Sequence, residues 1–183
     1  MFAGQPTMAA SYGTGKSKLK SEPGAEIFDN RHVLPLRIDL APDEPKAMQQ
    51  DNRKFVRATV SEGTNVWKEV GIRVKGAAGS TRDLNDKPAL TLAFAKFTPG
   101  QRFHGLRKIH LNNSVQDGSY LTENICSERF RKAGVPTPRV SYATLELNGK
   151  KKGLYVFCFP LFQMEPPHVG CYGTHPNQNP DSP

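Results

Sequence analysis

The dipeptide Asn148-Gly149 stands between two runs in which apolar and polar residues alternate, "RVSYATLEL" before it and "KKGLYVFCF" shortly after it. Asn-Gly accommodates the two positive φ angles of a type I′ turn, which joins antiparallel strands through a two-residue loop. Alternation with a period of two places the apolar side chains of a strand on one face. The sequence therefore predicts a β-hairpin near its C-terminal end, and this hairpin most strongly constrains the fold.

Five further runs have strand character, at residues 33–40, 54–62, 66–76, 88–97 and 106–113, and residues 42–51 connect two of them with a short helical turn. One helix is predicted over residues 118–133, with Asp117 as its N-cap. Gly134 and Pro136 end it, since glycine adopts the left-handed conformation and proline cannot continue a helix. We therefore expect an α+β domain, with an antiparallel sheet of hairpins and one main helix.

The folded domain is expected over residues 26–158. Residues 1–25 lack periodicity and are predicted to be disordered, and residues 159–183 form a proline-rich segment that we expect to be unstructured. No run is long and apolar enough for a membrane span, and no secretory signal is visible, so the sequence assigns no compartment.

The chain has 25 Lys and Arg against 17 Asp and Glu, a formal net charge of +8. Such a surplus favours nucleic acid, nucleotide phosphates or acidic protein as partners, although each basic run is equally consistent with a solvated surface. The three cysteines lack the spacing of metal ligands, so we expect no metal site from them.

The stretch "ASYGTGKS", residues 10–17, approaches the phosphate-loop pattern G-x-x-x-x-G-K-[ST]. A phosphate loop joins a buried strand to a helix, whose N-terminus then faces the phosphates. Neither element is predicted on either side of this stretch. We interpret it as a chance match.

A second candidate phosphate site lies in "VGIRVKGAAGSTR", residues 70–82. A strand there carries Arg73 and Lys75 and runs into a small-residue loop with Ser80 and Arg82. Small residues let backbone amides approach an anion, and the cations neutralise it. An ordinary charged hairpin loop remains the alternative.

A lysine and a glutamate further along the chain could complete such a site. Glu123 lies on the edge of the apolar arc of the predicted helix, where a carboxylate needs a cationic partner. Lys87, at the start of the next strand, could supply it. A strand lysine paired with a helix glutamate is how protein kinases hold nucleotide phosphates.

These motifs, in this order, resemble the N-terminal half of the kinase-like domain of the spore-coat protein H (CotH) family. The resemblance covers roughly residues 26–158. It rests on "RVKG", the Ser80–Arg82 loop, the Lys87 strand, "FHGLRKIHLNN", "DGSYLTE", "AGVPTPRVSYA" and "LNGKKKGLYV".

The resemblance implies an atypical protein kinase fold and, in the whole family, ATP- and Mg²⁺- or Mn²⁺-dependent phosphorylation of serine or threonine on coat or surface proteins. It implies that Lys87 binds phosphate, that Glu123 is its helix partner, and that Arg73, Lys75, Ser80 and Arg82 face the phosphates. Asn112, Asn113 and Asp117 fall in the turn before the helix, where we expect them to cap and shape it.

The chain departs from the family after "GLYV", because "CFPLFQMEPPHVG" stands where a helical C-terminal lobe is expected. After Glu123 the next aspartate is Asp181, so we assign no catalytic and no metal-binding residues. We expect a truncated or frame-shifted kinase that binds nucleotide weakly or not at all and is catalytically incompetent alone, unless another chain supplies the missing lobe. The alternatives are a non-catalytic basic binding module for nucleic acid or acidic protein, of which nucleic acid is the less favoured partner, or a structural coat component.

Overall fold

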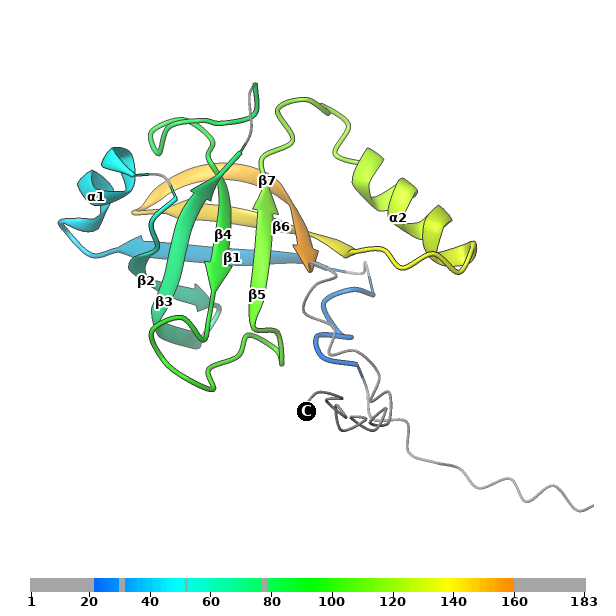
Figure 1. Ribbon diagram of the computed structural model, residues 1–183, viewed down its shortest axis with the longest axis horizontal. Helices are drawn as coiled ribbons and strands as arrows, with labels where there is room; N and C mark the ends of the chain where they lie inside the picture. Colours follow the sequence, from blue (N-terminus) through cyan, green and yellow to red (C-terminus); the bar gives the residue numbers. More distant parts are fainter. Residues whose placement is uncertain (1–21, 30–31, 52, 77–78, 160–183) are drawn as a thin grey trace, which may run out of the picture.

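The computed structural model describes residues 22–29, 32–51, 53–76, 79–159 of the chain. They form seven strands and two helices, in the order shown in Figure 1. The bounds are β1 (Val33–Leu40), α1 (Glu44–Gln50), β2 (Val56–Glu62), β3 (Asn65–Lys75), β4 (Ala89–Ala93), β5 (Lys108–Asn112), α2 (Thr122–Lys132), β6 (Arg139–Leu147) and β7 (Lys150–Phe159). The predicted strands and the short helical turn after the first strand are confirmed.

The sheet is a closed barrel, with strand order β1-β2-β3-β4-β5-β7-β6. All neighbouring strands are antiparallel except β1 and β6, whose parallel pairing closes the barrel. The expectation of an α+β sheet with one main helix, resembling a kinase N-lobe, is therefore wrong. Local alternation identifies strands and hairpins, but the pairing that joins the first strand to the sixth is set by packing between distant segments.

Two β-bulges bend the strands of the barrel. In the first, two residues of β3, Lys68 and Glu69, lie opposite the single position of β2 between Ala58 and Val60. Glu69 has a φ of +55°. In the second, Lys152 is the extra residue of β7 between Lys151 and Gly153. A bulge increases local twist and bend, which a small barrel needs to close.

The barrel interior is filled by aliphatic side chains and a cluster of aromatic rings. Phe94 and Phe103 are stacked with their centroids 5.1 Å apart, and Trp67 lies 4.8 Å from Phe103. The indole N–H of Trp67 donates to the carbonyl of Arg102 at 2.8 Å. These three rings bury large apolar areas, and the indole N–H of Trp67 is hydrogen-bonded. This end of the barrel is therefore a well-packed core.

Helix α2 lies outside the barrel, beside β6 (Figure 1). It begins at Thr122 rather than at residue 118, because residues 114–121 form turns first. Its end matches the prediction: Gly134 has a φ of +74°, and Val135 N–H donates to the carbonyl of Phe130 as in a Schellman motif. Leu121, Ile125 and Phe130 are exposed, so the expected apolar arc does not face the core.

Of the predicted disordered segment, only residues 22–25 are described, and they begin a turn that packs on the barrel. Ile27 enters the core, and Arg139 donates to the carbonyl of Pro23. The phosphate-loop-like stretch at residues 10–17 and the proline-rich residues 160–183 lie outside the described residues. In the described part of the chain, neither helix is long and apolar enough to cross a membrane.

His104 connects the residue 22–29 turn to the barrel through two carboxylates. Its Nδ1 lies 2.8 Å from Oε1 of Glu26, and its Nε2 lies 2.6 Å from Oε2 of Glu62. Carboxylate oxygens only accept, so both contacts require the doubly protonated ring. Burial alone would lower the pKa of His104, but the hydrogen bonds and charges of Glu62 and Glu26 outweigh it and raise the pKa.

We predict that the free energy of unfolding falls as pH rises above 6.5 through the folded-state pKa of His104. A raised folded-state pKa contributes stability that is fully present below the unfolded-state value and is lost when the folded ring deprotonates. Urea unfolding at several pH values from 6.5 to 8.5 measures the effect. His110 contributes with the opposite sign at the lower end of this window, because burial, with nearby Lys75, Lys108 and Arg73, lowers its folded-state pKa to about 4 while the unfolded ring still binds protons near pH 6.5. A variant of His104 keeps this contribution, so the difference between the two proteins isolates His104.

The variant His104→Gln provides the control. It should be less stable than the unchanged protein at pH 6.5 and should lose the decline above that pH. An identical decline in both proteins would show that another group titrates.

Candidate functional site

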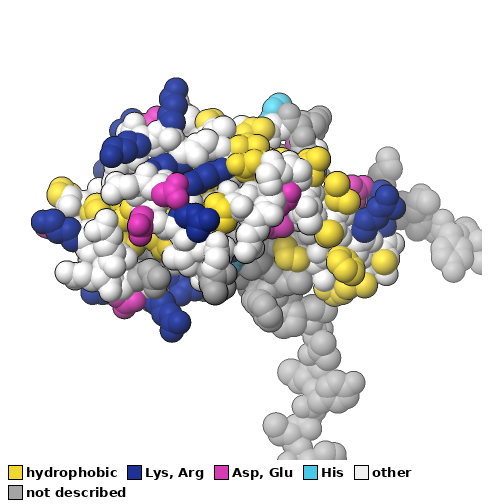
Figure 2. Space-filling model, turned by 90° about the horizontal axis from the view of Figure 1, so that it is seen from above, with side chains coloured by type: hydrophobic (Ala, Val, Ile, Leu, Met, Phe, Trp, Pro, Cys, Tyr) yellow, Lys and Arg dark blue, Asp and Glu magenta, His cyan; other side chains and the backbone are white. Residues whose placement is uncertain are grey.

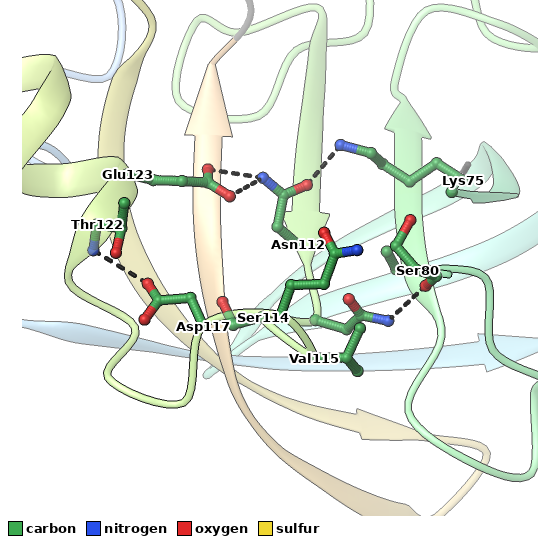
Figure 3. Close-up of a pocket in the computed structure, with 12 residues that line it drawn as sticks. Lys75, Ser80, Asn112, Ser114, Val115, Asp117, Thr122 and Glu123 are labelled. Atoms are coloured by element: carbon green, nitrogen blue, oxygen red, sulfur yellow. Dashed lines mark hydrogen bonds between the residues drawn. The ribbon is translucent and has the colours of Figure 1, made fainter. Parts of the chain in front are cut away.

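One pocket lies between the carboxyl end of β5, the loop after β3 and the start of α2. Its volume is about 690 Å³, which is within the range of small-molecule sites. Figure 3 shows side chains from all three segments turned toward it. It is lined by Lys75, Gly76, Ser80, Ala89, Asn112, Asn113, Ser114, Val115, Gln116, Asp117, Thr122 and Glu123.

One side-chain amide connects a cation to a carboxylate across this pocket (Figure 3). The Lys75 ammonium donates to Oδ1 of Asn112, and Nδ2 of Asn112 donates to both carboxylate oxygens of Glu123, at 2.8 and 2.7 Å. Lys75 ends β3, Asn112 ends β5 and Glu123 is in the first turn of α2. The strand order brings the first two together through the intervening β4.

The buried Cys158 contacts both Asn112 and Glu123 of this polar cluster. Its thiol donates to Oε2 of Glu123 at 2.9 Å. Burial and the Glu123 carboxylate raise the pKa of the thiol, so it stays protonated and acts as a donor. Burial also lowers the pKa of Lys75, while the negative charge of the neighbouring Glu123 opposes that shift. Glu123 thus accepts hydrogen bonds on both carboxylate oxygens.

Asp117 shapes the turn that leads from the pocket into α2. Its Oδ1 accepts from the hydroxyl and the backbone N–H of Ser119, and its Oδ2 accepts from the N–H of Thr122 at 3.0 Å. The hydrogen bonds from Ser119 and then Thr122 lower the pKa of Asp117 to about 2. The prediction of Asp117 as the N-cap residue is wrong, because α2 begins at Thr122 and Leu121 is in the N-cap position. Asp117 instead shapes the turn before the helix and accepts from the first helical N–H, five residues away.

The loop between β3 and β4 forms the opposite wall of the pocket. Gly76 is needed where the loop closes on itself, because a Cβ there would lie 2.7 Å from Oγ1 of Thr81. Arg82 is used within the loop, where it donates to the carbonyls of Gly79 and Thr81 and pairs with Asp86. It therefore does not line the pocket.

Asn113 joins the two ends of this loop. It is buried, and its Nδ2 donates to the carbonyls of Ser80 at 3.2 Å and Lys87 at 2.8 Å. These bonds hold Ser80 at the wall of the pocket.

Lys87 and Glu123 are not paired in the described structure. The Lys87 ammonium donates to the hydroxyl of Tyr120, and it lies 4.7 and 5.1 Å from the ring centroids of Tyr120 and Tyr155. Lys87 thus connects the β3–β4 loop to the turn before α2. Lys75 has the position next to Glu123 that the sequence assigned to Lys87.

Arg73 lies on the same side of the sheet as Lys75, but it does not line the pocket. Its guanidinium carbon is 5.1 Å from the ring centroid of Phe55, and its buried Nε has no hydrogen-bond partner among the described residues. Of the six residues predicted for the nucleotide site, the structure brings Lys75, Ser80 and Glu123 to one pocket and places Arg73, Arg82 and Lys87 outside its lining.

Sequence reasoning missed Asn112 as the bridging residue and Cys158 as its neighbour. Asn112 is part of the motif "IHLNN", and its position at the end of a strand was the available signal. Nothing in the sequence indicated that β5 and β7 pair and place residues 110 and 158 opposite each other.

The pocket suits a phosphate better than it suits a metal ion bound by protein alone. Lys75 offers a cation, and the glycine-containing loop allows close approach of backbone groups. Within the described residues, no three His, Cys, Asp or Glu side chains converge as a metal site would require. Mg²⁺ in phosphate sites usually needs only one or two carboxylates besides the substrate oxygens, and Asp117 and Glu123 are the two that line this pocket.

Residues 72–158 match the family model described as CotH kinase protein. A 60-residue stretch is also 32% identical to the inner spore coat protein H of Bacillus subtilis (strain 168). That alignment covers 33% of this chain and 17% of the relative, so the chain spans only a small part of the curated relative that it matches. The matched residues 72–158 include every lining residue of the pocket.

We predict that Asn112→Asp destabilises the protein at pH 7 by about 1–3 kcal/mol, the usual cost of leaving buried polar groups without their hydrogen bonds. The new carboxylate would face Glu123 and replace its donor. Chemical unfolding at pH 7 and pH 5 measures the effect, and the loss should shrink at pH 5 as the pair takes up a proton.

The matched control is Asn65→Asp, the same chemical change at an exposed strand end. It should be nearly neutral at both pH values. Equal stabilities of the two variants at pH 7 would contradict the bridging role of Asn112.

Proposed function

We propose that this chain, whose residues 72–158 match the family model described as CotH kinase protein, supplies the nucleotide-phosphate-binding part of a CotH-type protein kinase. The observation that carries the proposal is the Lys75 ammonium at the wall of the 690 Å³ pocket, connected through Asn112 to Glu123. A strand lysine held by a helix glutamate is the arrangement that protein kinases use for nucleotide phosphates.

Lys75 would neutralise and orient the phosphates. Glu123 acts on Lys75 through Asn112. By accepting from Nδ2 of Asn112, Glu123 fixes the side-chain amide so that Oδ1 faces the Lys75 ammonium. In protein kinases the two charged groups pair directly. Here the amide leaves the ammonium with two further N–H donors in addition to the one used by Asn112, and these can reach an anion in the pocket.

A bound ATP with its divalent ion would supply the transferable phosphoryl group. This chain's own residues would bind it on one side, with Ser80 and the β3–β4 loop forming the wall opposite Asp117. Both lining carboxylates already accept hydrogen bonds, Glu123 from Asn112 and Cys158, and Asp117 from Ser119 and Thr122. We therefore propose binding without efficient phosphoryl transfer by this chain alone.

We predict that the chain binds a fluorescent ATP analogue in the presence of Mg²⁺, and that Lys75→Met lowers the affinity about tenfold or more. Loss of one charge-assisted hydrogen bond has roughly that effect. Fluorescence anisotropy measures the dissociation constant. Lys54→Met, which removes an exposed lysine outside the pocket, should leave the affinity nearly unchanged.

Lys87→Met separates the two candidate lysines in the same assay. If Lys75 is the phosphate ligand, Lys87→Met weakens binding less than Lys75→Met does. The opposite order would return the phosphate role to Lys87, as the family resemblance implies.

We further predict no metal-dependent turnover in an assay with radiolabelled ATP and the pure chain. Turnover that scales with protein concentration and disappears in Lys75→Met would show that the chain is a competent kinase. The alternative of a basic binding module predicts instead that the protein binds a single-stranded oligonucleotide more tightly than ATP, with affinity that falls steeply as salt rises.

A further inference from the structure

We propose that Lys152 is a positioning residue for the β3–β4 loop, residues 79–88, and thereby for the phosphate-facing wall of the pocket. The proposal adds a residue that does not itself line the pocket. Its consequence for ligand binding rests on the proposed function, whereas its effect on the loop does not.

The backbone of β7 determines the direction of the Lys152 side chain. Leu145 pairs with Gly153 and Glu146 pairs with Lys151, so Lys152 is the unpaired residue of the bulge. Gly153 has a φ of +85°, a conformation that glycine adopts without strain. A bulge turns a side chain away from the regular alternation of its strand.

The ammonium of Lys152 meets three successive carbonyl groups of the loop. It donates to Leu84 at 2.7 Å, to Asn85 at 2.8 Å and to Asp86 at 2.6 Å. An ammonium has three N–H donors, and in Lys152 all three have acceptors in this loop, which is distant in sequence. Neighbouring Lys150 and Lys151 are exposed and make no such contacts among the described side chains.

The loop depends on such contacts because it lies between two strands and is not itself paired in the sheet. Asn113 holds its ends at Ser80 and Lys87, and the side chain of Leu84 packs against the core. Lys152 holds the segment between them. Ser80 and Gly76 line the pocket on one side of this segment, and Lys87 reaches Tyr120 on the other.

An ordered loop binds a ligand more tightly than a mobile one, because its conformational entropy has been lost before the ligand arrives. Lys152 would therefore raise nucleotide affinity without touching the nucleotide. The contact is specific to a donor with three N–H groups at this position, and charge alone would not reproduce it.

The experiment compares Lys152→Met with Lys150→Met, which removes the same charge from an exposed position two residues earlier in the same strand. Amide hydrogen exchange of residues 79–87 in the ligand-free protein reports loop order. Anisotropy with the ATP analogue reports affinity, at a temperature where circular dichroism shows all variants folded. We expect exchange in the loop about tenfold faster in Lys152→Met, as the loss of charge-assisted hydrogen bonds implies, with weaker nucleotide binding and no change in Lys150→Met.

Gly153→Ala tests the same idea if Lys152→Met fails to fold. An added Cβ meets nothing within 4 Å, so this variant acts through the backbone of the bulge alone. It should accelerate loop exchange to a smaller extent. If Lys152→Met folds and its loop exchange is unchanged, the positioning role is overturned. If Lys152→Met does not fold, unchanged loop exchange in Gly153→Ala overturns it.

The two proposals fail in different ways. Faster loop exchange with no nucleotide binding by the unchanged protein would contradict the proposed function and leave the loop contact established. Faster exchange with unchanged affinity would confirm the contact but overturn its consequence for the pocket.

Discussion

The parallel pairing of β1 with β6 is the contact on which the rest of the structure depends. It joins Val33 to Tyr142 and Ile38 to Leu147, and it converts a series of antiparallel hairpins into a closed barrel. Closure removes the exposed sheet edges and encloses the aromatic cluster around Phe103. It also fixes β7 between β5 and β6, which places Cys158 below Asn112.

The polar cluster at the pocket is built on that frame. Three elements contribute one side chain each, and the Asn112 amide satisfies both the ammonium of Lys75 and the carboxylate of Glu123. A direct ion pair would satisfy the two charges with each other. The amide instead keeps Lys75 at the wall of the pocket with donors to spare, which makes the cluster suitable for an anion.

The face of the molecule seen in Figure 2 differs between its two ends. Figure 2 shows hydrophobic side chains gathered toward the end where α2 lies, and Lys and Arg side chains scattered mainly over the other end. The exposed apolar residues of α2 and its flanks, among them Leu121, Ile125 and Val135, contribute to the first group. Helix α2 therefore owes its position to the turn before it, its Schellman end and the contacts of Glu123 and Ser127 rather than to an apolar face.

Local chemistry made several features predictable. The Asn148-Gly149 turn, the alternating strands, the Gly134 helix end and the turn-forming role of Asp117 each depend on residues close together in the chain. The match to the CotH kinase family model was predictable for the same reason, because its motifs lie in order along residues 72–158. The pairing of Lys87 with Glu123 was inferred from helix periodicity, and it failed because Tyr120 and Tyr155 take up the Lys87 ammonium.

The sequence by itself determined where strands, turns and helix ends occur, since φ preferences and side-chain alternation act over a few residues. Only the tertiary structure decided that the strands close into a barrel, that Lys75 rather than Lys87 faces Glu123 through Asn112, and that Lys152 reaches the loop at Leu84. These contacts join residues that are distant in the chain. Several residues would suit each contact chemically, and strand order and the bulge at Lys152 decide which of them meet. Neither the strand order nor the bulge can be read from local sequence pattern.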